Sequence, residues 1–95
     1  MTVYVAAQIT ITDRGRYDSY KNAFIDVLRP FGGRLLAADE APLLIEGRWD
    51  YEKFVLISFD DETTLRRWME SPEYQRISID RLAGSSGAVL LVRGL

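Results

Sequence analysis

Residues 2–11 alternate strictly between two kinds of side chain, and this period of two limits the fold more than any other feature of the sequence. Successive side chains of a β-strand point to opposite faces of a sheet, so the pattern predicts a strand with one wholly apolar face. The apolar face carries Val3, Val5, Ala7, Ile9 and Ile11. The other face carries Tyr4, Ala6, Gln8 and Thr10.

Two segments with the apolar spacing of a helix separate the predicted strands. Apolar residues recur three or four positions apart over 17–31, after Asp13, which is a suitable N-cap. A second helical region follows the acidic pair 60–61, which is expected to cap it, and carries Leu65, Trp68 and Met69. It restarts at Ser71, where we expect a second N-cap with proline at the first helical position.

The remaining strands are predicted over 34–38, 43–46, 53–59 and 88–93, with Pro42 interrupting the first two. The element order is then β-α-β-β-α-β, in which two right-handed crossovers are joined by a hairpin. We therefore expect an α+β fold: a ferredoxin-like sandwich, with a four-stranded antiparallel sheet and both helices on one face. Residues 1–95 form a single domain.

The apolar sets of the strands suit the sheet face beneath the helices, which leaves the opposite face exposed. That face is expected to carry Tyr4, Ala6, Phe54, Leu56 and Leu91. A contiguous apolar patch of this kind usually marks an interface. We therefore predict a homodimer that packs sheet against sheet, the commonest symmetric solution being a two-fold contact.

Composition excludes several classes of chemistry. The chain has neither cysteine nor histidine, so thiolate nucleophiles, thiolate metal sites and Ser-His-Asp arrangements are ruled out. Twelve basic and 14 acidic residues give a net charge of −2, which does not favour nucleic acid as a partner. The sequence contains no phosphate-binding or metal-binding motif, and we predict no cofactor. The N-terminus lacks the features of a signal peptide and no apolar run is long enough to cross a bilayer, which favours a cytoplasmic protein without a membrane partner.

Glu46 and Arg81 stand where the pattern expects apolar residues, at the end of a predicted strand and on the inner stripe of the last helix. Buried charges are expensive unless they are paired, so one interpretation is a structural ion pair between them. The functional interpretation makes Glu46 a proton acceptor in a pocket, with Arg81 holding an anionic group of the ligand. Structural ion pairs are common in proteins, which favours the structural interpretation.

Several aromatic and hydroxyl side chains are candidates for the same pocket. The phenols of Tyr17 and Tyr20 are placed to donate hydrogen bonds into it, although plain helix-to-sheet packing also explains aromatic residues at this spacing. Trp68 is an equally good core residue. Ser71 and Tyr74 flank the point where the last helix restarts.

The chain resembles the domain of unknown function 1330 family. The resemblance rests on Tyr17-x-x-Tyr20, Gly32-Gly33-Arg34-Leu35-Leu36, Glu46-Gly47-x-Trp49, and Trp68 before Ser71-Pro72-Glu73-Tyr74-Gln75 and Arg81. It implies small, mostly bacterial proteins of ferredoxin-like fold that dimerise through their sheets as dimeric α/β barrels, with no established reaction. The wider group includes haem enzymes and cofactor-free monooxygenases; a haem with a histidine ligand is excluded here.

Two functions are consistent with these sequence features. The first is a homodimer that binds a small acidic organic molecule between sheet and helices, with ligand contacts from Tyr17, Tyr20, Trp68, Ser71, Tyr74 and Arg81. If it is an enzyme, cofactor-free proton transfer or oxygenation is expected, with Glu46 as the base. The alternative is a non-catalytic interaction module in which Glu46 and Arg81 form a structural ion pair.

Overall fold

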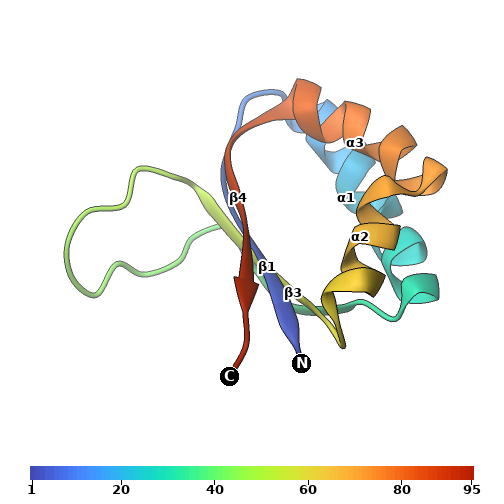
Figure 1. Ribbon diagram of the computed structural model, residues 1–95. Helices are drawn as coiled ribbons and strands as arrows, with labels where there is room; N and C mark the ends of the chain where they lie inside the picture. Colours follow the sequence, from blue (N-terminus) through green and yellow to red (C-terminus); the bar gives the residue numbers. More distant parts are fainter.

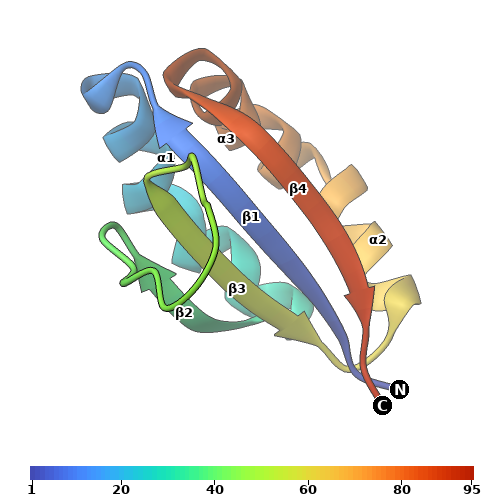
Figure 2. The same ribbon diagram turned by 90° about the vertical axis from the view of Figure 1, so that its left-hand side faces the viewer.

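A computed structural model describes residues 1–95 and confirms the ferredoxin-like order (Figure 1). The elements are β1 (Val3–Ile11), α1 (Arg14–Leu28), the short 3-10 helix η1 (Arg29–Phe31), β2 (Arg34–Asp39), β3 (Lys53–Phe59), α2 (Glu62–Glu70), α3 (Pro72–Gly84) and β4 (Ser85–Arg93). The four strands form one antiparallel sheet in the order β2-β3-β1-β4. All the helices cover the same face of the sheet (Figures 1 and 2). None of them is long and apolar enough to span a membrane.

The strand register explains which face is buried. Val5 stands opposite Ile57 on β3 and Leu91 on β4, and all three side chains contribute to the core beneath the helices. The expectation that Leu91 lies on the open face is therefore wrong. Its pairing with Val5 places it inside, and its neighbours Leu90 and Val92 take the outer positions.

The predicted helix caps are confirmed. The carboxylates of Asp13 and Asp61 accept hydrogen bonds from the backbone N–H groups of the first turns of α1 and α2. Ser71 Oγ does the same for α3, which starts at Pro72 as expected. Gly32 adopts φ = 77° where η1 ends, a conformation that glycine reaches without steric cost.

Residues 40–52, which we call the β2–β3 arm, differ from the prediction. The expected strand over 43–46 is absent, and β2 ends at Asp39. Pro42 removes a ladder donor, and the arm stands out from the open face of the sheet with no strand of the chain beside it (Figures 1 and 2). Its base is nevertheless fixed, because Glu52 N donates to Ile9 O at 2.8 Å and Trp49 Nε1 donates to Gln8 Oε1 at 2.7 Å.

The β4 strand is also longer than predicted. It begins at Ser85, directly after α3, rather than at Ala88. Gly84 makes this abrupt change possible because its carbonyl accepts from both Thr12 N and Asp13 N, at 2.9 and 3.1 Å. These bonds join the end of α3 to the turn that starts α1, and they fix one end of the sandwich.

The opposite end holds the most tightly buried side chains. Leu28 at the end of α1, Phe59 at the end of β3 and Leu65 in α2 are all fully buried. The two layers are therefore joined at both ends, and the middle of the sandwich lies between these two junctions.

The close approach at Gly84 generates a stability prediction. A Cβ at this position would lie 2.6 Å from Tyr17 N and 3.0 Å from Asp13 O, which are backbone atoms that cannot rotate away. We expect Gly84→Ala to lower the free energy of unfolding by about 1–3 kcal/mol, measured by urea denaturation.

Gly15→Ala is the matched control. A Cβ there would meet only Asp13 Oδ1, at 3.7 Å, in the first turn of α1. We expect this variant to be unchanged or to gain up to about 1 kcal/mol of stability through helix propensity. Equal losses in the two variants would contradict the packing argument.

Candidate functional site

A cavity of about 740 Å³ lies between the sheet and the helices. Its sheet wall is formed by inward residues of the strands, mainly Val5, Ala7, Ile9, Val55, Ile57 and Leu91. Its helix wall is largely aromatic and contains Tyr17, Tyr20, Phe24, Trp68 and Tyr74. The volume falls in the range of sites for small organic molecules, roughly 300–1,000 Å³.

The aromatic residues contact one another as a continuous cluster across the helix layer. The rings of Trp68 and Tyr74 lie 4.1 Å apart between centroids, and those of Phe24 and Trp68 lie 6.0 Å apart and nearly perpendicular. The hydroxyls of Tyr20 and Tyr74 share a hydrogen bond of 3.2 Å. Burial raises the pKa of Tyr20 well above its usual value, so this phenol stays neutral at physiological pH.

Two buried donors in the residues that line the cavity have no partner within the protein. They are Trp68 Nε1 and Arg81 Nε. Indole and guanidinium N–H groups can only donate, and a buried donor without an acceptor is unfavourable by about 1–3 kcal/mol. Both groups would gain from a hydrogen-bond acceptor that enters the cavity.

The structure brings most of the predicted ligand-binding residues together. Tyr17, Tyr20, Trp68, Tyr74 and Arg81 all line the cavity. Ser71 has a different role.

The hydroxyl of Ser71 is used within the backbone. Its Oγ donates to Trp68 O at 2.8 Å and accepts from Tyr74 N at 3.1 Å. Ser71 does not line the cavity, so it holds Trp68 and Tyr74 in position rather than facing a ligand.

Glu46 lies away from the cavity. It is exposed in the β2–β3 arm, on the side of the sheet opposite the helices, and it lines neither pocket described here. No ion pair joins Glu46 to Arg81 within the chain, whose charged pairs are formed by other residues. The hypothesis that placed them together assumed a strand over 43–46, and the arm replaces that strand.

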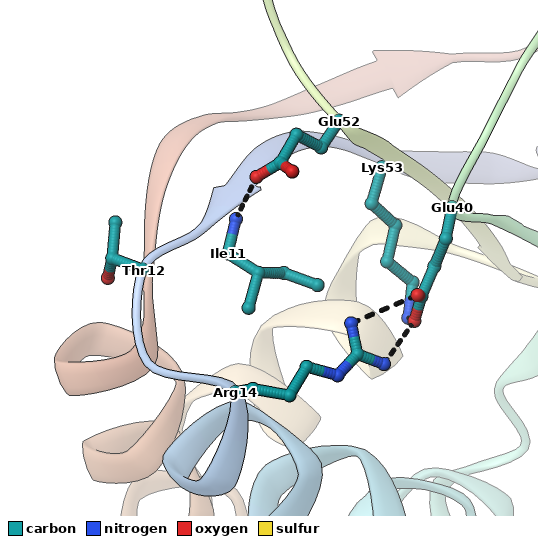
Figure 3. A pocket seen from close by; sticks show the side chains of 6 residues that line it. All are labelled: Ile11, Thr12, Arg14, Glu40, Glu52 and Lys53. Atoms are coloured by element: carbon teal, nitrogen blue, oxygen red, sulfur yellow. Dashed lines mark hydrogen bonds and ion pairs between the residues drawn. The ribbon is translucent and has the colours of Figure 1, made fainter.

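Lys53 is a cavity residue that the sequence reasoning missed. Only 3% of the residue is exposed, and its Nζ lies 4.7 Å from the centre of the Tyr17 ring. The ammonium group is 3.6 Å from Glu40 Oε2 (Figure 3). The alternation of the strand could have predicted this position. Lys53 is two residues before Val55 and four before Ile57, so its side chain must point to the same inner face as theirs.

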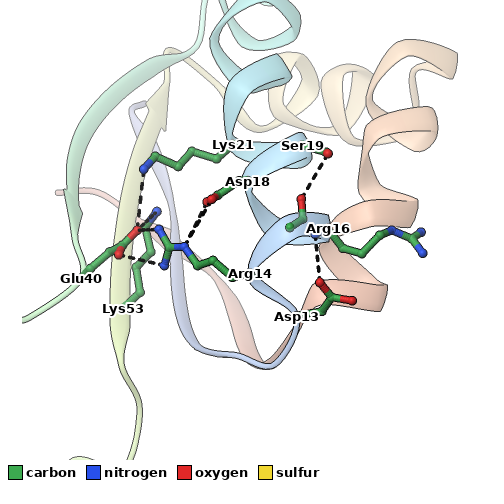
Figure 4. Close-up of polar contacts among 9 residues, drawn as sticks. Asp13, Arg14, Arg16, Asp18, Ser19, Lys21, Glu40 and Lys53 are labelled. Carbon is green, nitrogen blue, oxygen red and sulfur yellow. Dashed lines mark hydrogen bonds and ion pairs between the residues drawn. The ribbon is translucent and has the colours of Figure 1, made fainter.

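Lys53 also lines a second, smaller pocket of about 270 Å³, with Glu40, Arg14, Ile11, Thr12 and Glu52 (Figure 3). In this pocket Arg14 donates two hydrogen bonds to the Glu40 carboxylate, of 3.0 and 2.8 Å. This pairing lowers the pKa of Glu40 to about 2. Lys21 Nζ adds a longer contact of 3.8 Å from α1 (Figure 4).

No group of three or more acidic side chains lies close enough to hold a metal ion. Besides its phenols and the indole of Trp68, the cavity lining offers two guanidinium groups, two amines, an amide and a hydroxyl, from Arg66, Arg81, Lys21, Lys53, Gln75 and Ser78.

The lowered pKa of Glu40 predicts a pH-dependent contribution to stability. The carboxyl group has a pKa near 4.5 when unfolded and about 2 when folded, so the ionised form stabilises the fold above pH 4.5, and this contribution is lost as the pH falls towards 2. We expect wild type to be more stable than Glu40→Gln at neutral pH, with a difference that shrinks over this window. Urea denaturation as a function of pH measures it.

Asp50→Asn serves as a control for that experiment, because Asp50 pairs only with Arg48 in the exposed arm. We expect a much smaller pH-dependent difference for this variant. A gap between wild type and Glu40→Gln that stays constant from neutral pH to pH 2 would contradict the pairing with Arg14.

The fold is shared with several solved structures of low sequence identity. A protein of unknown function from Rhodopseudomonas palustris has a TM-score of 0.83 at 13% identity, with 99% of this chain and 82% of that chain covered. A dimeric ferredoxin-like protein of unknown function from Jannaschia has a TM-score of 0.66 at 22% identity, with 97% and 96% covered. SnoaB, a cofactor-independent oxygenase from Streptomyces nogalater, has a TM-score of 0.69 at 16% identity, with 99% and 93% covered.

These similarities show the fold and no more. No curated protein matches the chain. A family model matches residues 2–95, almost the whole chain. The protein therefore belongs to the family described as domain of unknown function (DUF1330), as the tyrosine pair, the Glu-Gly pair and the Trp-x-x-Ser-Pro-Glu-Tyr-Gln segment indicated.

Proposed function

We propose that the protein binds a small, largely apolar organic molecule with an acidic group in the central cavity. The observation that carries the proposal is a cavity of about 740 Å³ whose lining residues include Trp68 and Arg81, each with a buried donor, Nε1 and Nε, that has no hydrogen-bond partner within the protein. Apolar walls with a few placed polar groups are typical of sites that bind such molecules.

The kinds of polar group in the cavity favour an acidic ligand over a basic one. Arg81, Trp68 and Lys53 supply only donors, and two of the three carry positive charge when protonated. The phenols of Tyr20 and Tyr74 are already hydrogen-bonded to each other. A carboxylate, phenolate or enolate oxygen therefore matches the lining better than an amine does.

The same donors would also support chemistry without a cofactor. Fixed donors that stabilise a developing enolate or phenolate favour removal of a proton from the ligand. The fold is similar to that of SnoaB, a cofactor-independent oxygenase, which makes oxygenation of such an anion a reasonable reaction class. Glu46, the predicted base, does not line the cavity and has no role in this proposal within a single chain.

Calorimetric titration tests the ligand class. We use naphthoic acid as the acidic probe and naphthalene methanol as its neutral counterpart. A charge-assisted hydrogen bond to Arg81 should make the acid bind about tenfold tighter or more, equivalent to about 1.4 kcal/mol. Arg81→Gln should remove this preference and leave binding of the alcohol unchanged.

Arg67→Gln is the matched control, because Arg67 is an exposed residue of α2 that does not line the cavity. We expect it to bind both probes as wild type does. The proposal fails if neither probe binds wild type, or if Arg81→Gln weakens binding of the acid and the alcohol equally.

We also propose that two chains associate through the open face of the sheet. That face presents the outward residues of β1, β3 and β4, including Tyr4, Phe54, Leu56, Leu90 and Val92. The arm stands out from the same side and exposes Leu43 by 86% and Ile45 by 90% (Figure 2). Exposed apolar groups concentrated on one side favour an interface, and the Jannaschia relative is described as dimeric.

A charge on the open face tests this association. Two-fold symmetry introduces each substitution twice, so we expect Val92→Glu to raise the dimer dissociation constant by about tenfold or more in sedimentation equilibrium. Ile79→Glu is the control, because Ile79 is similarly exposed but lies on α3, on the far side of the molecule. A monomeric wild type, or equal effects of the two substitutions, would disprove the interface.

A further inference from the structure

Lys53 is chemically distinct from every other amine of the chain. The sequence contains only two lysines, Lys21 and Lys53. The side chain of Lys21 is 50% exposed on α1, whereas that of Lys53 is 4% exposed on β3. An amine in such a position is either a structural cation or a reactive group.

The contacts of Lys53 are weak for a structural cation. Its only charged partner is Glu40 Oε2 at 3.6 Å, which is beyond hydrogen-bond distance. The Glu40 carboxylate is bound more closely by Arg14, through two hydrogen bonds, so Lys53 is its secondary partner (Figure 4). On the other side of Lys53 are the ring of Tyr17 and the apolar cavity wall.

The charged groups around Lys53 come from two elements. Helix α1 contributes Arg14, Asp18 and Lys21, and the start of the β2–β3 arm contributes Glu40. On β1, Lys53 stands opposite the apolar Ile9. Burial lowers the pKa of Lys53 and outweighs the opposing effect of Glu40, so a larger fraction of this amine is neutral than of an exposed lysine.

We propose that Lys53 forms an imine with an aldehyde or ketone group of the molecule held in the central cavity. This inference rests on the proposed function, since the ligand must first occupy the cavity. The position of Lys53 carries the inference. The side chain of Lys53 is buried, its amine lies beyond hydrogen-bond distance of its one charged partner, and the residue lines both pockets.

The reaction is balanced without an oxidant or a cofactor. The neutral Nζ attacks the carbonyl carbon and gives a carbinolamine. The carbonyl oxygen then leaves as water with the two protons of the amine, and a C=N bond replaces the C=O bond. Protonation of the imine restores a positive charge beside Glu40, which is ionised and within reach to stabilise it.

An iminium at this position would acidify the C–H bonds next to the former carbonyl carbon. The substrate class is therefore a small aromatic or alkyl carbonyl compound with an acidic group, and the reaction class is proton abstraction next to that carbonyl.

Reductive trapping tests the inference. The full-length protein is incubated at neutral pH with carboxybenzaldehyde and sodium cyanoborohydride, and labelled peptides are quantified by mass spectrometry. We expect Lys53 to carry about tenfold more label than Lys21, which also lines the cavity but has a half-exposed side chain, because the buried amine of Lys53 is more often neutral. Excess carboxybenzyl alcohol, which fills the cavity but cannot form an imine, should protect Lys53 and leave the label on the exposed N-terminal amine of Met1 unchanged.

Two variants complete the test. Lys53→Arg keeps the positive charge and should lose the cavity label, whereas Lys21→Arg should keep it. If Lys53→Arg does not fold, protection by the alcohol in wild type decides the same question.

Label on Lys21 and the N-terminal amine, with none on Lys53, would overturn the imine. Calorimetry with naphthoic acid separates the two proposals. Binding of that acid without any label on Lys53 overturns only the imine, whereas absence of both overturns the cavity as a binding site.

Discussion

The helix layer is joined to the sheet at the two ends of the sandwich, and the cavity lies between these two junctions. At one end Gly84 accepts two hydrogen bonds from the turn before α1. At the other, Leu28, Phe59 and Leu65 are packed without exposed surface. Between the ends the aromatic side chains of the helices pack mainly on one another, as Trp68 does on Tyr74. The space opposite them forms the cavity, whose sheet wall consists mainly of Val, Ala, Ile and Leu side chains.

The alternation of the strands and the caps of the helices were sufficient to predict the fold. Residues 53–59 form a strand with the predicted bounds, and Asp13, Asp61 and Ser71 each begin a helix. These features are local, since each depends on side chains within a few positions of the element. The helix tyrosines that face the sheet were also predicted from their spacing. Spacing, however, does not distinguish a filled core from a cavity. That distinction depends on the separation of the layers.

Two of the errors have one cause, which is that pairing between distant segments overrides local pattern. An apolar run over 43–46 has the composition of a strand but finds no partner in the chain, and Glu46 is carried away from the cavity with it. Leu91 was assigned to the wrong face because its register with Val5 was unknown. Lys53 differs from these two cases, because its parity with Val55 is a local feature that already places its side chain on the inner face.

The side chains that line the cavity also limit what chemistry is available at neutral pH. Burial raises the pKa values of Tyr17 and Tyr20, so both phenols remain protonated. The chain has no histidine or cysteine, and burial lowers the pKa of Lys53 in the cavity wall. The proposed proton transfer is therefore best served by Lys53 or by the ligand itself.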